Sequence, residues 1–227
     1  GADKHGNFVW VESMLQDKYG NLWLGSHSHG LKRVRRAITQ RFSRKQGIPD
    51  PYVWAIMPWQ QHMLAGTSGG LSLLQYGQFQ PLMANQYLPN NFIYSLLLDT
   101  QQRLWVGTRA GLSRLDGGTL AWQRNYDAIA HLLVTTLAQE DERIWVGTNG
   151  GLFYLQQDEL LQHDVPDVLR QAKVRMVYPD SQQRLWVGTE SGLYVRDANG
   201  FSQVENMPLS GSFISTVKEF SDGTILI

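Results

Sequence analysis

The chain has 227 residues, no cysteine, 22 glycines and eight tryptophans, and its 20 basic and 20 acidic residues give a formal net charge of zero. The absence of cysteine excludes a disulfide-stabilised scaffold and a thiolate metal site. The balanced charge argues against a protein dedicated to nucleic acid or to an anionic membrane surface, because either partner requires a basic excess.

A five-residue motif of the form Leu-Trp-Val-Gly-Thr recurs along the chain. Its glycines are 41, 41, 40 and 41 residues apart, at Gly25, Gly66, Gly107, Gly147 and Gly188. An apolar run precedes each copy and a Gly-Leu pair follows it, and a sixth copy begins at Ile214 and runs to Ile227. A fixed period of this length is typical of repeat architectures, so the repeat decides the fold.

The third copy indicates which elements one repeat encodes. Short β-prone segments alternate with polar or glycine-rich turns, at 93–98, 103–108, 111–115 and 120–123. In the fourth copy Asn149-Gly150 lies between two such segments, which predicts a hairpin turn with positive φ at both residues. Four strands of about five residues in each repeat predict a four-stranded antiparallel blade of a β-propeller.

The predicted fold is therefore all-β, a β-propeller segment of five blades and a partial sixth over residues 8–227. The blades are expected at 8–46, 47–87, 88–127, 128–168 and 169–209, with the partial blade at 210–227. Arrays of paired helices are excluded, because two glycines in every repeat would interrupt the helices. Only residues 164–172 could form a short helical turn.

The motif tryptophans and glycines are predicted to be structural. The indoles fill the gap between adjacent blades, and the five glycines above allow the next blade to approach closely. The tryptophans are Trp23, Trp105, Trp145 and Trp186. The second copy has Leu64 at this position, and we expect Trp54 or Trp59 to compensate for the smaller side chain.

An acidic residue precedes each of these tryptophans, at Asp17, Asp99, Glu140 and Asp180. A group repeated at a turn in successive blades is a poor candidate for catalysis, so we expect these carboxylates to cap backbone amides of the turn. Arg103, Arg143 and Arg184 also recur, and we expect them to form ion pairs on the surface.

The block Asp-x-x-Gln-x-Leu-Trp-Val-Gly-Thr-x-x-Gly-Leu, present at 99–112 and 180–193, resembles the two-component regulator propeller repeat. The resemblance covers residues 8–227 and implies the extracytoplasmic sensor region of a bacterial hybrid two-component sensor or membrane-bound diguanylate cyclase. It further implies a periplasmic location and signal transduction in response to a ligand such as a glycan fragment. Propellers of this family usually have seven blades, so we expect a fragment of a longer propeller, or self-association through its open end blades.

Candidate ligand-binding residues lie in the loops, which vary between copies while the strands repeat. The loop after each Gly-Thr and the loop before each first strand should lie on one face, because successive strands alternate direction. The residues chosen from these loops are His27, His29, Tyr52, Trp54, Asn90, Tyr94, Arg109, Asn149, Arg175 and Glu190. Their aromatic rings and polar tips suit a small polar ligand or an oligosaccharide.

Two other functions are weighed against the sensor. A protein-interaction platform would be favoured if Trp10, Trp59 and Trp122 were exposed together. A propeller lyase would need a metal with a His-Glu pair, and no catalytic motif is present. His27 and His29 could share a metal, but a third ligand at a fixed spacing is missing, so no metal, cofactor or enzymatic activity is expected of this segment. Nucleic acid is not expected as a partner, and a membrane only through the parent protein.

Overall fold

The computed structural model describes residues 10–35, 38–204, 213–220 and 222–227. The chain divides into two compact units, which are described separately. The first comprises residues up to 109 together with 113–125, and the second comprises 110–112 together with 126–227. The predicted start of the first blade at residues 8–9 and the predicted boundary at 209–210 lie outside the described residues.

Each of the five complete repeats predicted folds into a four-stranded antiparallel sheet with its strands in chain order. The first sheet contains β1 (Val11–Gln16), β2 (Leu22–Ser26), β3 (Leu31–Arg35) and β4 (Ile38–Phe42), and is followed by η1 (Arg44–Gln46). The second contains β5 (Val53–Trp59), β6 (His62–Thr67), β7 (Gly70–Gln75) and β8 (Gln78–Pro81), followed by η2 (Met83–Gln86). The third contains β9 (Ile93–Leu98), β10 (Arg103–Thr108), β11 (Gly111–Asp116) and β12 (Trp122–Tyr126), followed by η3 (Asp127–Ile129).

The remaining sheets lie in the second unit. The fourth sheet contains β13 (Val134–Glu140), β14 (Arg143–Thr148), β15 (Gly151–Gln156) and β16 (Glu159–Leu161), followed by α1 (Asp167–Arg170). The fifth contains β17 (Val174–Pro179), β18 (Leu185–Thr189), β19 (Gly192–Asp197) and β20 (Gly200–Gln203). A two-stranded sheet of β21 (Lys218–Glu219) and β22 (Ile225–Leu226) follows. The predicted all-β blade architecture is confirmed, and a short helical turn lies within 164–172 as expected. The prediction that only this segment could form one is wrong, because η1, η2 and η3 are also short helical turns.

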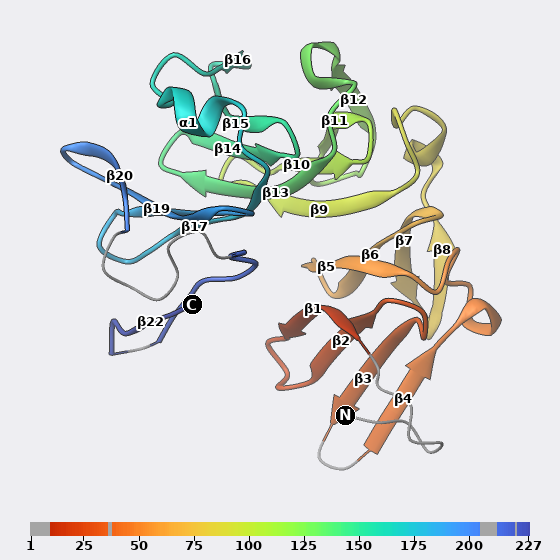
Figure 1. The fold of residues 1–227 in the computed structure, drawn as a ribbon. Coiled ribbons are helices and arrows are strands. Elements are labelled where there is room, and N and C mark those ends of the chain that lie inside the picture. The colour runs from red at the N-terminus through yellow and green to blue at the C-terminus, as the bar shows by residue number, and fades with distance from the viewer. Residues whose placement is uncertain (1–9, 36–37, 205–212, 221) are drawn as a thin grey trace. The chain divides into compact units, whose positions relative to one another are not determined.

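Neighbouring sheets meet through their first strands. In the first unit β5 lies beside both β1 and β9, and in the second β13 lies beside β17 (Figure 1). This is the arrangement that radial stacking of blades requires, with the first strand of each blade innermost.

Two turns differ from the sequence prediction. Asn149 and Gly150 do not have positive φ; the left-handed region is entered at Gly151, with φ 139°. The cause is the motif threonine, because the Thr148 hydroxyl accepts from the Gly150 amide at 3.1 Å and donates to the Gly151 carbonyl at 2.7 Å. In the third sheet the last strand begins at Trp122 rather than at residue 120. Leu120 has φ 61° and is buried, so it belongs to the preceding turn.

The four motif tryptophans are buried, as predicted, with exposed fractions between 0% and 8%. The Trp145 ring lies 5.2 Å from that of Tyr154 in its own sheet and 5.9 Å from that of Phe201 in the fifth sheet. The glycine two residues later explains how the sheets come so close. A Cβ at Gly147 would lie 2.5 Å from Thr136 Cγ2 and 2.7 Å from Val174 Cγ1, the latter in β17 of the fifth sheet.

Of the two tryptophans predicted to compensate for Leu64 in the second sheet, Trp59 has this position. Trp59 is buried in the same hydrophobic cluster as Leu64. Its indole Nε1–H donates to the Gly117 carbonyl at 2.5 Å. Trp54 instead lies at the opposite end of β5, where its indole donates to the Ser68 hydroxyl at 2.9 Å.

The recurrent aspartates cap the turn amides as predicted, and they also bind the indole. Asp180 Oδ1 accepts from the amides of Gln182 and Arg184, both at 2.9 Å. Its Oδ2 accepts from Trp186 Nε1 at 2.8 Å and from Arg184 Nε at 2.6 Å. Asp99 makes the equivalent four contacts. Arg103 and Arg184 were predicted to form ion pairs on the surface. This is wrong, because their partners Asp99 and Asp180 have no exposed side-chain area.

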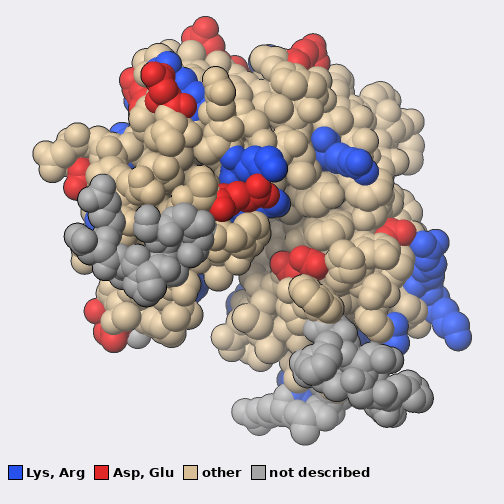
Figure 2. Space-filling model, in the orientation of Figure 1, with Lys and Arg blue, Asp and Glu red and all other residues tan. Residues whose placement is uncertain are grey.

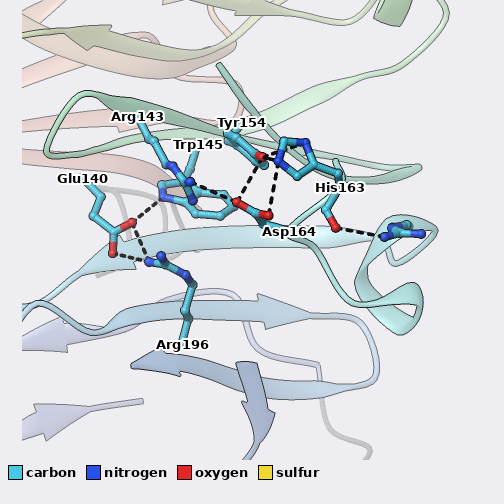
Figure 3. A network of polar contacts seen from close by, with 8 residues as sticks. Glu140, Arg143, Trp145, Tyr154, His163, Asp164 and Arg196 are labelled. Carbon is cyan, nitrogen blue, oxygen red and sulfur yellow. Dashed lines mark hydrogen bonds and ion pairs between the residues drawn. The ribbon is translucent and has the colours of Figure 1, made fainter. Parts of the chain in front are cut away.

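Glu140 departs from this pattern for a geometric reason. The turn that follows it is one residue shorter, since Glu140 pairs directly with Arg143. The longer Glu140 side chain still reaches the Trp145 indole, at 3.0 Å from Oε2, and also accepts from Arg196 Nη1 of the fifth sheet at 2.8 Å (Figure 3). In place of the predicted turn cap, Glu140 thus links two neighbouring blades. Arg143 pairs instead with Asp164, at 2.9 Å.

Stability should fall with acidification because of these turns. Burial would raise the pKa of Asp17 and of Asp180, but the indole, side-chain and backbone hydrogen bonds that each accepts hold the pKa of both below its ordinary value. A carboxyl whose pKa is lower in the folded state stabilises the fold above its unfolded pKa, and that stabilisation is lost as the pH falls through the folded value. We therefore expect the melting temperature to decrease progressively below about pH 5. Thermal unfolding at constant ionic strength measures this, and a melting temperature unchanged down to about pH 2.5 would contradict it.

Candidate functional site

The loops that carry the candidate residues lie side by side at one end of each sheet. The residue that follows the Gly-Thr or Gly-Ser of the motif donates its backbone N–H to the residue that precedes the first strand. The bonds are His27 to Trp10, Ser68 to Tyr52, Arg109 to Phe92, Asn149 to Leu133 and Glu190 to Lys173, at 3.0–3.1 Å. In every sheet the hairpin loop and the start of the first strand therefore form one surface, as alternating strand direction requires.

A β-bulge recurs at this end of all five sheets. The register of the first strand against the second shifts at its second residue, so that this residue has no direct partner. The bulged residues are Glu12, Trp54, Tyr94, Thr135 and Arg175. Bulges of this kind bend a strand end and re-aim a side chain, and they are frequent beside active sites. The fold therefore presents a different side chain at the same point of each blade.

Four rings from three sheets form a continuous row in the first unit. His27 lies 4.8 Å from Tyr52 and 5.5 Å from Trp54, edge to face in both cases. Tyr52 and Trp54 are stacked at 6.3 Å, and Trp54 lies 5.0 Å from Tyr94. We call these four residues the aromatic row. Val53 and Ile93 point into the core with no exposed area, so the residues beside them on β5 and β9 project to the opposite side.

Glu12 contacts the aromatic row, and the other polar candidates of the first unit contact residues outside it. The His27 Nδ1 lies 2.9 Å from Glu12 Oε1. The Arg109 guanidinium lies over the Phe92 ring at 5.4 Å. Asn90 accepts from the Phe92 amide at 2.8 Å, so its side chain shapes the loop in front of β9. His29 Nδ1 contacts the Ser28 hydroxyl at 2.9 Å.

In the second unit the same positions are mainly charged. Arg175, at the bulge, forms an ion pair with Glu190 in the hairpin loop, and Lys173 pairs with Glu190 at 3.1 Å. These two partners hold the pKa of Glu190 below its ordinary value. Asn149 is engaged in the backbone, since its Oδ1 accepts from the Leu133 amide at 2.9 Å. Of the predicted residues in this unit, Arg175 and Glu190 are thus paired, and Asn149 joins its hairpin loop to the loop before β13.

Sequence reasoning missed two residues of this face, Glu12 and Thr135. Both occupy the bulged position that Trp54, Tyr94 and Arg175 occupy in the other sheets. Glu12 lies 13 residues before its motif glycine, as Tyr94 does, and Thr135 lies 12 before its own, as Trp54 does, so a comparison that allowed for both spacings would have identified them. Thr135 donates its hydroxyl to the carbonyls of Gly147 and Val174, at 3.0 and 2.8 Å. Its role is thus to join neighbouring strands, whereas Glu12 lies at the edge of the aromatic row.

Among the described residues, no group of three or more His, Cys, Asp or Glu side chains is placed to hold a metal ion. No helix in the described part of the chain is long and apolar enough to cross a membrane.

On the face drawn in Figure 2, basic and acidic side chains lie in small separate groups with uncharged surface between them. A protein-interaction platform would be favoured if Trp10, Trp59 and Trp122 were exposed together. They are not, because Trp59 is buried while Trp10 and Trp122 are exposed.

Comparison with known proteins gives a family match over three segments of the chain. A family model described as Two component regulator propeller matches residues 3–28, 87–110 and 169–191. No curated protein matches the chain.

Solved structures share the fold at low sequence identity. The extracellular domain of a putative hybrid two component system from B. thetaiotaomicron has a TM-score of 0.76 and 18% identity, and the match covers 95% of this chain and 32% of that one. PorZ of Porphyromonas gingivalis, a bacterial surface component of the type-IX secretion system, has a TM-score of 0.67 and 18% identity, over 93% of this chain and 29% of that one. Virginiamycin B lyase of Staphylococcus aureus has a TM-score of 0.66 and 10% identity, over 87% of this chain and 71% of that one. This chain spans about a third of the length of the first of these structures.

Proposed function

We propose that this chain, which carries two component regulator propeller repeats, is the ligand-sensing part of a bacterial signalling protein and acts in the periplasm. The observation that carries this proposal is the aromatic row, formed by residues that do not repeat, at the loop end of sheets that do. A rigid scaffold that presents variable side chains at one end is suited to recognition. The similar extracellular domain of a putative hybrid two component system supports the same role.

The ligand that fits this surface is a small polar molecule, such as a glycan fragment. Flat rings stack on the apolar faces of sugar rings, while hydroxyl and carboxylate groups orient the ligand's hydroxyls. Tyr52 and His27 are both at least one-third exposed, so their rings are accessible. Glu12 and the Tyr52 hydroxyl supply acceptors and a donor beside them. The segment itself acts by binding, and the rest of the parent protein supplies the catalytic output.

Replacing Trp54 by alanine tests this proposal. Trp54 contacts three of the other side chains on this surface, those of His27, Tyr52 and Tyr94, so its removal should weaken ligand binding by about tenfold or more. The measurement is a thermal-shift screen of the whole chain against a panel of oligosaccharides, followed by calorimetric titration of the hits. The matched control is Trp122→Ala, which removes an exposed tryptophan from β12, outside the aromatic row.

The Trp122→Ala variant also distinguishes the two candidate functions, a ligand sensor and a protein-interaction platform. The first unit contains a groove of about 870 Å³ lined by Met83, Tyr87 and Trp122, among others. This exposed apolar surface favours the platform as the second candidate function. A ligand whose affinity falls in Trp54→Ala and not in Trp122→Ala supports the sensor. Equal affinities in both variants and the wild type, or a panel with no stabilising ligand, would refute it.

A further inference from the structure

A pocket lies between the first and second sheets of the first unit, at the end opposite the aromatic row. It has a volume of about 390 Å³, and its lining includes the turn between β1 and β2 and the turn between β5 and β6. This volume is in the range of sites that hold small molecules. Lys18, Arg33 and His62 are its basic side chains, and the rings of Tyr19 and Tyr76 border it and are largely exposed.

The Arg33 side chain is held in place by uncharged groups. Its guanidinium lies over the rings of Trp23 and Phe42, at 5.5 and 6.0 Å from the ring centres, and its Nη2 donates to Gln40 Oε1. Among the described residues no carboxylate pairs with Arg33. A guanidinium carries five N–H donors in a rigid fork, so Arg33 keeps donors for a ligand while its position is fixed.

Lys18 is a second cation without a charged partner. It is exposed, its Nζ lies 5.2 Å from the ring centre of Tyr19, and it makes no ion pair within the described part of the chain. Asp17 is the one carboxylate in the lining. It already accepts four hydrogen bonds, from the backbone amides of Tyr19 and Asn21, the Asn21 side chain and the Trp23 indole. The pocket thus presents two cations and one carboxylate that is fully engaged.

The corresponding groove between the fourth and fifth sheets differs in this respect. Three arginines line it, and each has a carboxylate partner. The pairs are Arg143–Asp164, Arg184–Asp180 and Arg196–Glu140, at 2.9, 2.6 and 2.8 Å. The charges of Lys18 and Arg33 are not neutralised in this way, so they are available to a ligand. A cleft with an excess of one charge concentrates ions of the opposite sign.

The geometry points to a binding site for an oxyanion in this pocket, a phosphate or a carboxylate group. The fork of Arg33 matches either group and can donate two parallel N–H bonds to it. Lys18 adds a second positive charge. The exposed rings of Tyr19 and Tyr76 offer flat apolar surface on which the ring of an organic ligand can stack. The site is distinct from the aromatic row and does not depend on the sensor proposal.

Nuclear magnetic resonance of the indole N–H groups tests the assignment, because Trp23 lies in the lining beneath Arg33. Phenyl phosphate and benzoate carry the two oxyanions on a ring, inorganic phosphate is the anion alone, and benzyl alcohol is the uncharged control. We expect a saturable shift of the Trp23 signal, identified with Trp23→Phe, at about 1–10 mM phenyl phosphate or benzoate. The Trp105 and Trp186 signals should not move, and benzyl alcohol should leave the Trp23 signal in place.

The remaining probes identify the source of the oxyanion. Tighter binding of phenyl phosphate than of benzoate assigns the site to phosphate groups, and the reverse order assigns it to carboxylates. Inorganic phosphate that binds as tightly as phenyl phosphate identifies the free ion as the ligand, whereas binding that is about tenfold weaker identifies a ring compound.

Three variants complete the test. Arg33→Gln removes the guanidinium and keeps a side-chain amide, so it should weaken phenyl phosphate binding by about tenfold. Lys18→Gln changes an exposed residue, so it stays informative even if Arg33→Gln fails to fold, and it should weaken binding by about threefold. The matched control is Lys32→Gln, the same change of charge at the exposed neighbour of Arg33 on β3, whose side chain points to the other face of the sheet.

A loss of affinity in Arg33→Gln or Lys18→Gln, with Lys32→Gln unchanged, supports the site. The inference is overturned if the Trp23 signal moves with none of the anionic probes, or if benzyl alcohol binds as tightly as phenyl phosphate. It is also overturned if Arg33→Gln and Lys18→Gln both bind phenyl phosphate like Lys32→Gln.

Discussion

Replacing Trp145 by alanine is expected to lower the free energy of unfolding by about 3–5 kcal/mol. The side chain has no exposed area and packs against Tyr154 and Phe201, so its loss leaves a cavity between two blades. The change also removes the indole donor to Glu140, whose other partner is Arg196 (Figure 3). Urea denaturation followed by circular dichroism measures the effect as a lower transition midpoint.

Two further variants separate the causes of this loss. Trp145→Phe keeps an aromatic ring in the gap and removes the N–H donor, so it should recover more than half of the lost stability. Trp10→Ala removes an indole that is 75% exposed and should change the free energy of unfolding by less than about 0.5 kcal/mol. If Trp145→Ala and Trp10→Ala destabilised the protein equally, the indole between the blades would not have the structural role given to it.

The sequence predicts the blade because the repeat constrains it several times over. Each motif glycine has a copy about 41 residues away, and the tryptophan recurs in every copy except the second, so a chance match in one blade is corrected by the others. For the smaller Leu64 of the second copy, the sequence offers two nearby tryptophans, Trp54 and Trp59, as the side chain that compensates. Only the structure distinguishes them, because the two residues lie at opposite ends of β5 and only Trp59 is buried in the cluster that contains Leu64.

The features that the sequence leaves open depend on pairing between strands. A bulge at Trp54 or Tyr94 does not alter the repeat length, so the period contains no signal for it. The φ values at Asn149 and Gly150 follow from a hydrogen bond to Thr148, which outweighs the local preference of the Asn-Gly pair. Glu140 illustrates the reverse case. Its turn is one residue shorter, which is visible because Trp145 follows Glu140 by five residues whereas Trp105 follows Asp99 by six, but the blade-to-blade contact with Arg196 is not visible in the sequence.

The candidate site was predicted as a set of loops, and its arrangement required the structure. The loops share an end of each sheet because strand direction alternates, which follows from the sequence alone. The ring contacts among His27, Tyr52, Trp54 and Tyr94 depend on side chains from three different sheets, at distances that the repeat does not specify. Asn90 and Asn149 have the same polar character as binding residues, yet both bond to the backbone, Asn90 within its own loop and Asn149 to the loop before β13.

Replacing Asp180 by asparagine is expected to lower the free energy of unfolding by about 3–5 kcal/mol, the range for removing one partner of a buried ion pair. Asp180 accepts four hydrogen bonds, two from backbone amides and two from the Trp186 indole and the Arg184 guanidinium. Asparagine has one acceptor oxygen, so its NH₂ group must face either the two amides or the indole and guanidinium donors. The Arg184 charge would also lose its partner within the half-buried turn.

The matched control for this loss is Asp116→Asn. Asp116 accepts from the amides of Gly118 and Thr119 in a turn of the third sheet, and it lies outside the set of aspartates that bind a motif indole and an arginine. Its replacement should therefore leave the unfolding transition close to that of the wild type. The loss in Asp180→Asn should in addition shrink as the pH falls, because the wild-type carboxyl becomes protonated below its lowered pKa and then resembles the amide. A loss that is the same at pH 7 and at pH 2.5, or a loss as small as that of Asp116→Asn, would show that the ionised carboxylate does not hold the indole and the arginine together.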